Sequence, residues 1–279
     1  MAGGAADGAA EGLSTAEVLR GVGRALAGAV LFALPIFMTM EVWSLAVSVT
    51  RVRLVLLVLA GVLLSIGLAH YFGFVNKERI GALDAVIDAG VAMLAGLVAA
   101  AAVLCLLAVV EPWQGWRTAL SVVALEALPA AIGASFARSQ LGADRRRAYK
   151  HHAQWREGFL MAAGAVVVAA NIAPTEEVVL IAARMSPVHG AVLIAFELAL
   201  MHAFVYGLRF RSGTSLQGGT WKVLLTWTVI AHVIALGVSA YLLWTFGRFD
   251  GTGLSQVVME TVVLALPAGL GAAAARLVV

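Results

Sequence analysis

Residues 89–110 read AGVAMLAGLVAAAAVLCLLAVV, a run that contains no charged side chain. A helix of about 20 residues crosses a hydrocarbon layer of about 30 Å, so this run is long enough to span a membrane. The whole chain has the same character, with 62% hydrophobic and only 13% charged residues over 279 positions. Ordinary soluble domains have about 25% charged residues. The composition therefore predicts an all-α, polytopic membrane helix bundle and excludes a soluble domain of useful size.

Hydropathy predicts about eight transmembrane helices along the chain. Because backbone polar groups must be satisfied inside lipid, each apolar run is expected to form one continuous helix. The expected spans are 25–49, 53–73, 88–110, 117–137, 159–183, 187–208, 222–246 and 256–277.

The placement of the charges predicts how the chain is oriented. If both termini are cytoplasmic, 14 of the 19 Lys and Arg residues fall on inner segments and five on outer loops. This bias is the one that the positive-inside rule expects, and it supports an even number of crossings. Residues 1–19 have no basic n-region of a secretory signal and are expected to form a disordered juxtamembrane tail. The single cysteine, Cys105, has no partner in the chain, so no disulfide is expected.

Two sequence matches indicate an internal repeat. Residues 127–130 (ALPA) recur at an offset of 138, and residues 39–42 (TMEV) are similar to the stretch TEEV at an offset of 136. The matches predict two parallel four-helix repeats. The expected boundaries are 20–138 for the first repeat, 139–155 for a basic cytoplasmic linker and 156–279 for the second repeat. The linker is interpreted as a topology anchor, with contact to anionic lipid headgroups as the alternative.

Four prolines fall in the first and last expected helix of each repeat. Proline lacks the backbone donor of the helical ladder and clashes with the preceding turn, so it can bend or break a helix. Such a defect is tolerated in lipid only where protein or a wet cavity covers it. The expected helix breaks are Pro35, Pro129, Pro174 and Pro267.

Glutamates accompany all four prolines. A charged group at the bilayer centre costs about 2.5–3.5 kcal/mol on insertion scales, so each carboxylate must be protonated, hydrated or bound to a cation. The run at 171–177 adds amide and hydroxyl oxygens of the kind that hard cations prefer. The structural alternative is that protonated glutamates hydrogen-bond carbonyls on neighbouring helices. The residues predicted to line a cation or proton pathway are Glu41, Glu126, Asn171, Thr175, Glu176, Glu177, Glu197 and Glu260.

Two histidines, His202 and His232, lie within the sixth and seventh expected spans. Such residues are more often packing groups, but an imidazole beside a carboxylate can relay protons. The chain has no His-Glu-x-x-His or Cys-x-x-Cys spacing, no Walker-type loop and no Gly-x-Ser-x-Gly motif. We therefore expect no enzymatic activity, no cofactor and no nucleic-acid partner, and the identity of any metal stays open.

The motifs LPxxxTMExW at 34–43 and NxAPTEE at 171–177 resemble a family of bacterial integral membrane proteins without an assigned function. The resemblance covers most of the chain and implies a polytopic membrane fold but no activity. Together with the basic-residue bias, it implies the bacterial inner membrane, with both termini cytoplasmic. The second motif is also similar to the asparagine-proline-glutamate signatures of cation/calcium exchangers. This chain departs from them because Thr175 separates proline from glutamate and because its repeats look parallel, where theirs are inverted.

Three classes of function fit these features. The leading hypothesis is a secondary transporter or channel for a cation, alone or coupled to protons. The second is a membrane sensor or assembly protein whose glutamates are protonated packing groups. The third is an intramembrane enzyme acting on lipid, for which no nucleophile or metal motif is found. The expected partners are the lipid bilayer, an inorganic cation or proton and a second copy in a homo-oligomer, since the alanine- and glycine-rich helix faces permit close packing.

Overall fold

The computed structural model describes residues 15–72, 82–111, 113, 115–141, 153–211 and 227–277. Helices are the only regular secondary structure in these ranges. Their bounds are α1 (Thr15–Phe37), α2 (Met40–Ser48), α3 (Arg51–Phe72), α4 (Ala82–Leu106), α5 (Trp116–Leu141), α6 (Ala153–Ala169), α7 (Glu176–Arg184), α8 (Pro187–Arg211), α10 (Val229–Thr245) and α11 (Leu254–Leu277).

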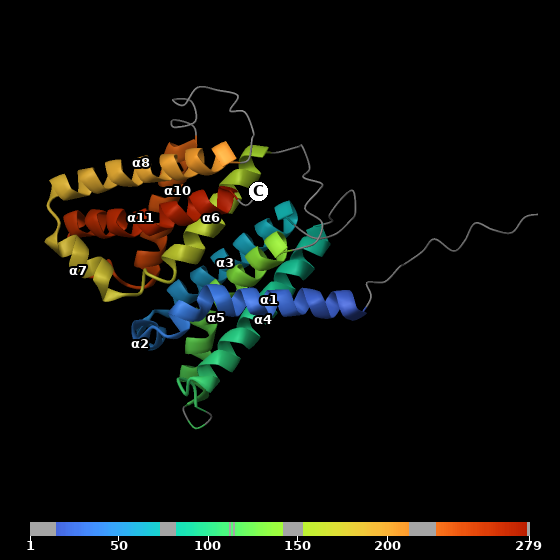
Figure 1. Ribbon diagram of the computed structural model, residues 1–279. Coiled ribbons are helices and arrows are strands. Elements are labelled where there is room, and N and C mark those ends of the chain that lie inside the picture. Colours follow the sequence, from blue (N-terminus) through green and yellow to red (C-terminus); the bar gives the residue numbers. More distant parts are fainter. Residues whose placement is uncertain are drawn as a thin grey trace, which may run out of the picture.

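The helices form two groups that follow one another along the chain. In the first group α5 packs against α1, α3 and α4, and in the second α11 packs against α6, α8 and α10. The short helices follow the same rule, because α2 contacts α5 and α7 contacts α11. Both short helices lie at the same end of the bundle (Figure 1). The groups meet mainly through α3 and α5 on one side and α6 on the other.

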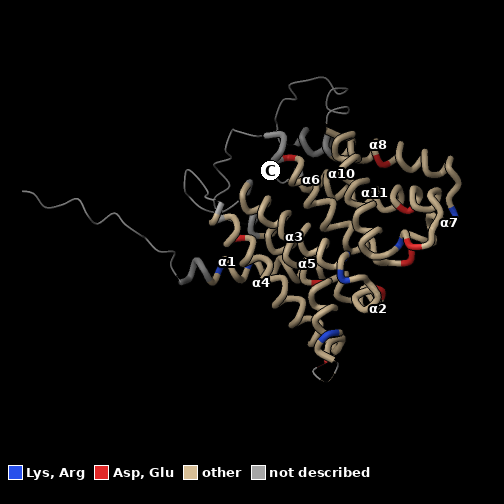
Figure 2. The backbone as a smooth tube through the Cα atoms, turned by 180° about the vertical axis from the view of Figure 1, so that it is seen from behind, with Lys and Arg blue, Asp and Glu red and all other residues tan. Residues whose placement is uncertain are grey.

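Length and composition qualify several of these helices to cross a membrane. Among the described residues there are six such helices, which lie in α1, α3, α4, α5, α8 and α11. Two further helices carry shorter apolar segments, Glu157–Ala169 in α6 and Val229–Thr245 in α10. Long stretches of the bundle carry no charged residue (Figure 2). The fold is a helical membrane bundle, as the composition predicts.

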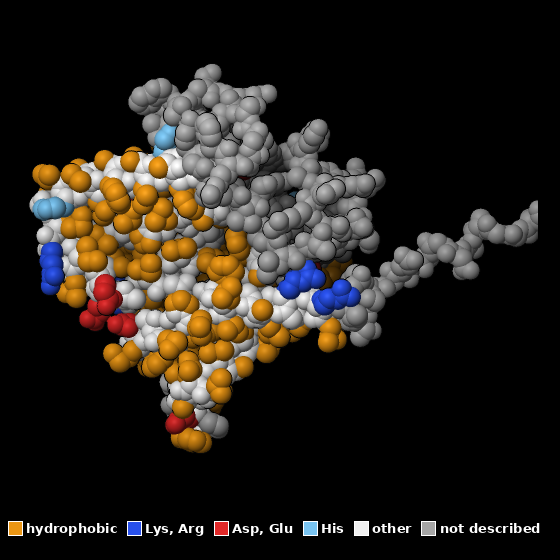
Figure 3. Space-filling view, in the orientation of Figure 1, with side chains coloured by type: hydrophobic (Ala, Val, Ile, Leu, Met, Phe, Trp, Pro, Cys, Tyr) orange, Lys and Arg blue, Asp and Glu red, His pale blue; other side chains and the backbone are white. Residues whose placement is uncertain are grey.

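Large apolar side chains cover the outside of the bundle, while small ones fill its interior. The alanines Ala25, Ala29 and Ala33 of α1 are completely buried, whereas Leu63 and Phe196 are 66% and 55% exposed. Hydrophobic side chains cover a wide face of the molecule (Figure 3). A soluble protein buries side chains of this size more often than alanine, but lipid solvates them, and small residues let membrane helices approach closely.

Paired glycines allow close helix contacts in both groups. A Cβ added at Gly28 of α1 would run into the side chain of Ala137 and lie 2.8 Å from the carbonyl oxygen of Gly133, both on α5. In the second group, a Cβ added at Gly164 of α6 would run into the carbonyl oxygen of Gly271 on α11. Glycine at these positions therefore allows backbone-to-backbone packing that alanine would prevent.

Two of the expected continuous helices are broken, which corrects the spans 25–49 and 159–183. Residues 38–39 separate α1 from α2, and residues 170–175 separate α6 from α7. The backbone stays hydrogen-bonded within the breaks, since the N–H of Thr39 donates to Ile36 O at 3.0 Å and that of Thr175 donates to Ile172 O at 3.0 Å. A continuous helix was expected because backbone N–H and C=O groups in lipid need hydrogen-bond partners. In the breaks, these local turns provide such partners.

Pro129 and Pro267 do not break their helices, contrary to expectation. Both lie inside the uninterrupted helices α5 and α11. Each of these helices is packed on several sides by its own group. We attribute their continuity to this packing, which holds the turns on either side of the missing donor in register. Pro35 is also inside a helix, two residues before α1 ends, and Pro174 lies in the turn before α7.

Several expected segments lie outside the described residues. They are the tail up to residue 14, most of the linker at 139–155 and the first five residues of the span 222–246.

Candidate functional site

The predicted pathway glutamates fall into two classes by burial. Glu126, Glu197 and Glu260 are completely buried. Glu41 is partly buried, while Glu176 and Glu177 are exposed at the start of α7. In the part of the chain that the structure describes, no group of three or more His, Cys, Asp or Glu residues is placed to hold a metal ion. Each buried carboxylate therefore has its own surroundings, and the cation or proton pathway through these acids stays a prediction.

Glu197 and His232 form a buried carboxylate–imidazole pair between α8 and α10. The distance between Glu197 Oε1 and His232 Nδ1 is 2.9 Å. Glu197 is completely buried and His232 is 8% exposed. The second carboxylate oxygen, Oε2, is buried and has no hydrogen-bond partner among the described residues. The pair therefore joins a carboxylate and an imidazole, two groups that can each bind a proton, and leaves one carboxylate oxygen unused.

A second polar contact joins α8 and α10 about one turn from this pair. His202 Nδ1 lies 3.5 Å from the hydroxyl oxygen of Thr228, which is buried. Thr228 and His232 are four residues apart, so they share one face of the same helical segment. Seven residues beyond His232, the buried hydroxyl of Ser239 lies on that face too. Thr228, His232 and Ser239 thus form a row of polar side chains along one face of an otherwise apolar helix.

The carboxylate of Glu197 also packs directly on α11. A Cβ added at Gly269 would run into Glu197 Oε1 and lie 2.8 Å from the sulfur of Met201. Because residue 269 is glycine, there is room for the carboxylate of Glu197 to lie between α8, α10 and α11.

The side chain of Asn171 joins the two groups of helices through hydrogen bonds to backbone. Its amide nitrogen donates to the carbonyl of Phe32 at 3.2 Å and to that of Val167 at 2.6 Å. Its amide oxygen accepts from the N–H of Ile36 at 3.2 Å. Phe32 and Ile36 are spaced as helical partners on either side of the turn that Pro35 disturbs. Both amide hydrogens are thus used on backbone, which is a different role from the predicted cation ligand.

The threonines of the two breaks make equivalent local bonds. The hydroxyl of Thr39 donates to Pro35 O at 2.7 Å, and that of Thr175 donates to Ile172 O at 2.9 Å. The Thr39 hydroxyl therefore bonds a carbonyl in the last turn of α1, and the Thr175 hydroxyl bonds a carbonyl within the break itself. This contact explains the threonine that the two motifs share.

The cation at the α6–α7 break is a side chain of the protein itself. Arg248, in the turn between α10 and α11, donates a hydrogen bond from its guanidinium to the carbonyl oxygen of Pro174. No motif in the sequence pairs Arg248 with Pro174, which lies 74 positions away.

Gln256 fixes the position of Glu260. Its amide nitrogen donates to Glu260 Oε1 at 3.0 Å and to the carbonyl of Val179 on α7 at 3.3 Å. The other oxygen of Glu260 is buried without a described partner. Gln256 thereby links α11 to α7. It bonds one oxygen of the Glu260 carboxylate and leaves the other without a hydrogen bond from it.

Glu126 is the most isolated of the buried acids. Neither of its oxygens has a hydrogen-bond partner among the residues described. The indole of Trp43 lies near the carboxyl group, but its N–H donates to the carbonyl of Phe37 at 3.1 Å. Among the described residues, no hydrogen bond therefore offsets the cost of burying Glu126.

We expect replacement of Glu126 by leucine to stabilise the fold. The change removes two buried acceptors that have no described partner and puts an apolar side chain of similar size in their place. It should raise the free energy of unfolding by about 1–3 kcal/mol. Thermal unfolding in detergent measures the effect. A lower midpoint for this variant would show that the Glu126 carboxyl has a stabilising partner after all.

An ion pair ties the α10–α11 turn to α3. The two guanidinium nitrogens of Arg53 donate to the two oxygens of Asp250 at 2.6 Å each. The guanidinium also lies 5.2 Å from the centre of the Trp244 ring. The hydrogen bonds from Arg53 hold the pKa of Asp250 below its usual value. The pair thus joins the two groups of helices near the end that carries α2 and α7.

Acid should remove the contribution of this ion pair. Because the pKa of Asp250 is lower in the folded protein, its stabilisation is present above the ordinary Asp pKa of about 3.9 and is lost as the pH falls through the folded value. Asp250→Asn should lower the free energy of unfolding by at most about 1 kcal/mol at pH 7, since Asp250 is largely exposed. Midpoints measured from pH 7 to pH 3 should converge for the two proteins. A constant difference would contradict this assignment.

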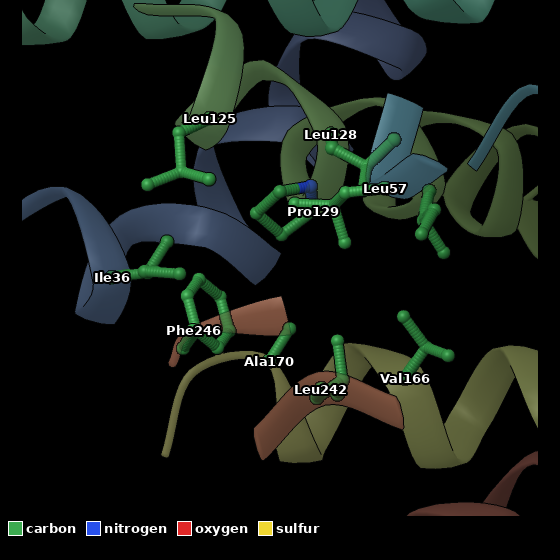
Figure 4. A pocket seen from close by; sticks show the side chains of 10 residues that line it. Ile36, Leu57, Leu125, Leu128, Pro129, Val166, Ala170, Leu242 and Phe246 are labelled. Carbon is green, nitrogen blue, oxygen red and sulfur yellow. The ribbon is translucent and has the colours of Figure 1, made fainter. Parts of the chain in front are cut away.

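A small apolar pocket lies where the two groups of helices meet (Figure 4). It is lined by Ile36, Leu128 and Pro129 from the first group and by Val166 and Leu242 from the second, among others. Its volume of about 10 Å³ is close to the minimum for one water molecule, and its lining offers no polar side chain to hold one. The pocket is an apolar seam and not a ligand site.

Comparisons with known proteins place the chain in a family. No curated protein and no solved structure gives a significant match. A family model matches residues 21–279, which include all the helices of the site. On this match, the chain belongs to the family described as "Putative integral membrane protein (DUF2391)".

Proposed function

We propose that this integral membrane protein is a proton-coupled cation transporter in which Glu197 and His232 bind the proton. The observation that carries the proposal is the 2.9 Å contact between a completely buried carboxylate and an imidazole in apolar helices. Ionisable groups in such surroundings are costly, and they occur characteristically in proton relays.

The geometry supports transfer through the imidazole ring. Nδ1 of His232 faces Glu197 Oε1. A proton that binds at the opposite nitrogen, Nε2, makes the ring an imidazolium, which can then pass its Nδ1 proton to the carboxylate and become neutral again. The contact between His202 and Thr228 extends this row of polar side chains along α8 and α10.

Topology completes the proposal. We infer eight crossings of a bacterial inner membrane with both termini cytoplasmic, where α1–α2 and α6–α7 each count as one broken crossing. The placement of α2 and α7 at one end of the bundle supports this count. Two parallel repeats are supported by the glycine contacts of Gly28 and Gly164, which lie 136 residues apart, as do the threonines of the two breaks.

Proton flux into proteoliposomes tests the function. Vesicles containing a pH-sensitive dye are given a potassium diffusion potential, inside negative, and a panel of external cations. Vesicles with the protein should acidify faster than protein-free vesicles, and a coupled cation should change the rate. Equal rates under every condition would contradict transport and favour the assembly or sensor hypothesis.

A further inference from the structure

The helix at the centre of each group buries one glutamate, and the two glutamates lie on nearly the same face of their helices. Glu126 is three residues before Pro129 in α5, and Glu260 is seven residues before Pro267 in α11. The two positions therefore differ by four residues, which is about one helical turn. Both helices also pack against the short helix of their own group, α2 or α7. A buried acid at this place thus recurs in both groups.

The two acids differ in what surrounds them. Gln256 donates to Glu260 Oε1, whereas neither oxygen of Glu126 has a hydrogen-bond partner in the described part of the chain. Glu126 is also completely buried. Because leucine is expected to stabilise the fold at this position, the carboxyl group does not serve folding. A residue that breaks a rule of stability is expected at a functional site.

The surroundings of Glu126 determine which cation it can bind. Hard ions such as Ca²⁺ take about six to eight oxygen ligands. Around Glu126, as in all the described ranges, no three His, Cys, Asp or Glu side chains come together to hold a metal ion. An ionised carboxylate that is buried alone is very costly, and such a group becomes neutral by taking up a proton. The proton is the cation that a single carboxyl group binds without further ligands.

We infer that Glu126 is a second proton-binding site, separate from Glu197 and His232, which holds a proton in this structure and exchanges it with water during transport. Glu126 belongs to α5 and Glu197 to α8, so each group of helices carries a proton of its own. The nine-residue helix α2 packs on α5 and is bounded by non-helical residues at 38–39 and 49–50. A displacement of α2 as a unit therefore uncovers part of α5 and provides a route for the exchange.

Infrared spectroscopy of the full chain in lipid detects this proton directly. A protonated carboxyl group has a C=O stretching band that an ionised carboxylate lacks. At pH 7, Glu126→Gln should lose intensity in this band, because the change removes one protonated acid. In the wild type, the band that Glu126 contributes should shift within minutes of transfer to D₂O. Glu126→Leu, the variant expected to be more stable, gives a second difference spectrum if glutamine disturbs folding.

Glu176→Gln is the matched control, because Glu176 is exposed on α7. This variant should lose carboxylate bands and keep the C=O band of the wild type. Loss of carboxylate bands in the Glu126 variants would show that Glu126 is ionised and would overturn the inference. A C=O band that stays unshifted after days in D₂O would also overturn it, because Glu126 would then be a permanently protonated packing group.

The inference rests on the proposed function for the role of this proton in transport, but the spectra record the proton without any flux. Contrary spectra beside intact proton flux would therefore refute the Glu126 site alone. The expected spectra without flux would refute transport and support the binding site.

Discussion

Replacing Glu197 with glutamine should reduce proton flux through the reconstituted protein by about a hundredfold or more, the lower end of the range for loss of a proton-transferring group. Glutamine is nearly isosteric and can still hydrogen-bond His232, so the packing on Gly269 is retained. It cannot bind and release a proton. Dye-reported acidification of proteoliposomes measures the rate, normalised to the amount of protein inserted.

Glu176→Gln is the matched control for this experiment. Glu176 is exposed on α7, and no role in the buried pair is assigned to it. Its neutralisation should leave the flux unchanged. Wild-type flux in Glu197→Gln would show that the buried carboxylate is not on the proton path.

Alanine at Gly164 should be among the most destabilising single-methyl additions in the chain. The added Cβ would run into the carbonyl oxygen of Gly271, which belongs to the α11 backbone and cannot turn away. Separating α6 from α11 should cost about 1–3 kcal/mol of unfolding free energy, which corresponds to about 2–4 °C per kcal/mol for a chain of this size. Thermal unfolding in detergent measures the loss.

Gly158→Ala provides the comparison on the same helix. A Cβ at Gly158 would meet no atom within 4 Å, so helix propensity alone should stabilise this variant by up to about 1 kcal/mol. If both alanine variants moved the midpoint in the same direction, close packing of α6 on α11 would not be the source of the effect.

Much of the fold could be predicted from the sequence because its signals are local. Uncharged runs such as 89–110 predict membrane helices from composition alone, and the structure places α4 there. The proline-containing motif at 171–177 marks the stretch where α6 ends and α7 begins. Pro129 and Pro267 show the limit of this approach, because whether a helix continues past proline depends on the helices packed around it.

The site was less predictable because its contacts join distant parts of the chain. Glu197 and His232 are separate candidates in the sequence, and only the packing of both α8 and α10 on α11 brings them to 2.9 Å. Asn171 was recognised for its oxygen, yet its partners Phe32 and Ile36 are backbone groups of another helix, which leave no trace in side-chain patterns.

A double-mutant cycle of proton flux tests the central claim that Glu197 and His232 act as one proton-binding unit. Flux is measured for the wild type, Glu197→Gln, His232→Gln and the double variant in identical vesicles. We predict that each single change lowers the flux as far as both changes together, because a unit that has lost one member has little left to lose. Wild-type flux in His232→Gln, or losses that multiply in the double variant, would contradict the account.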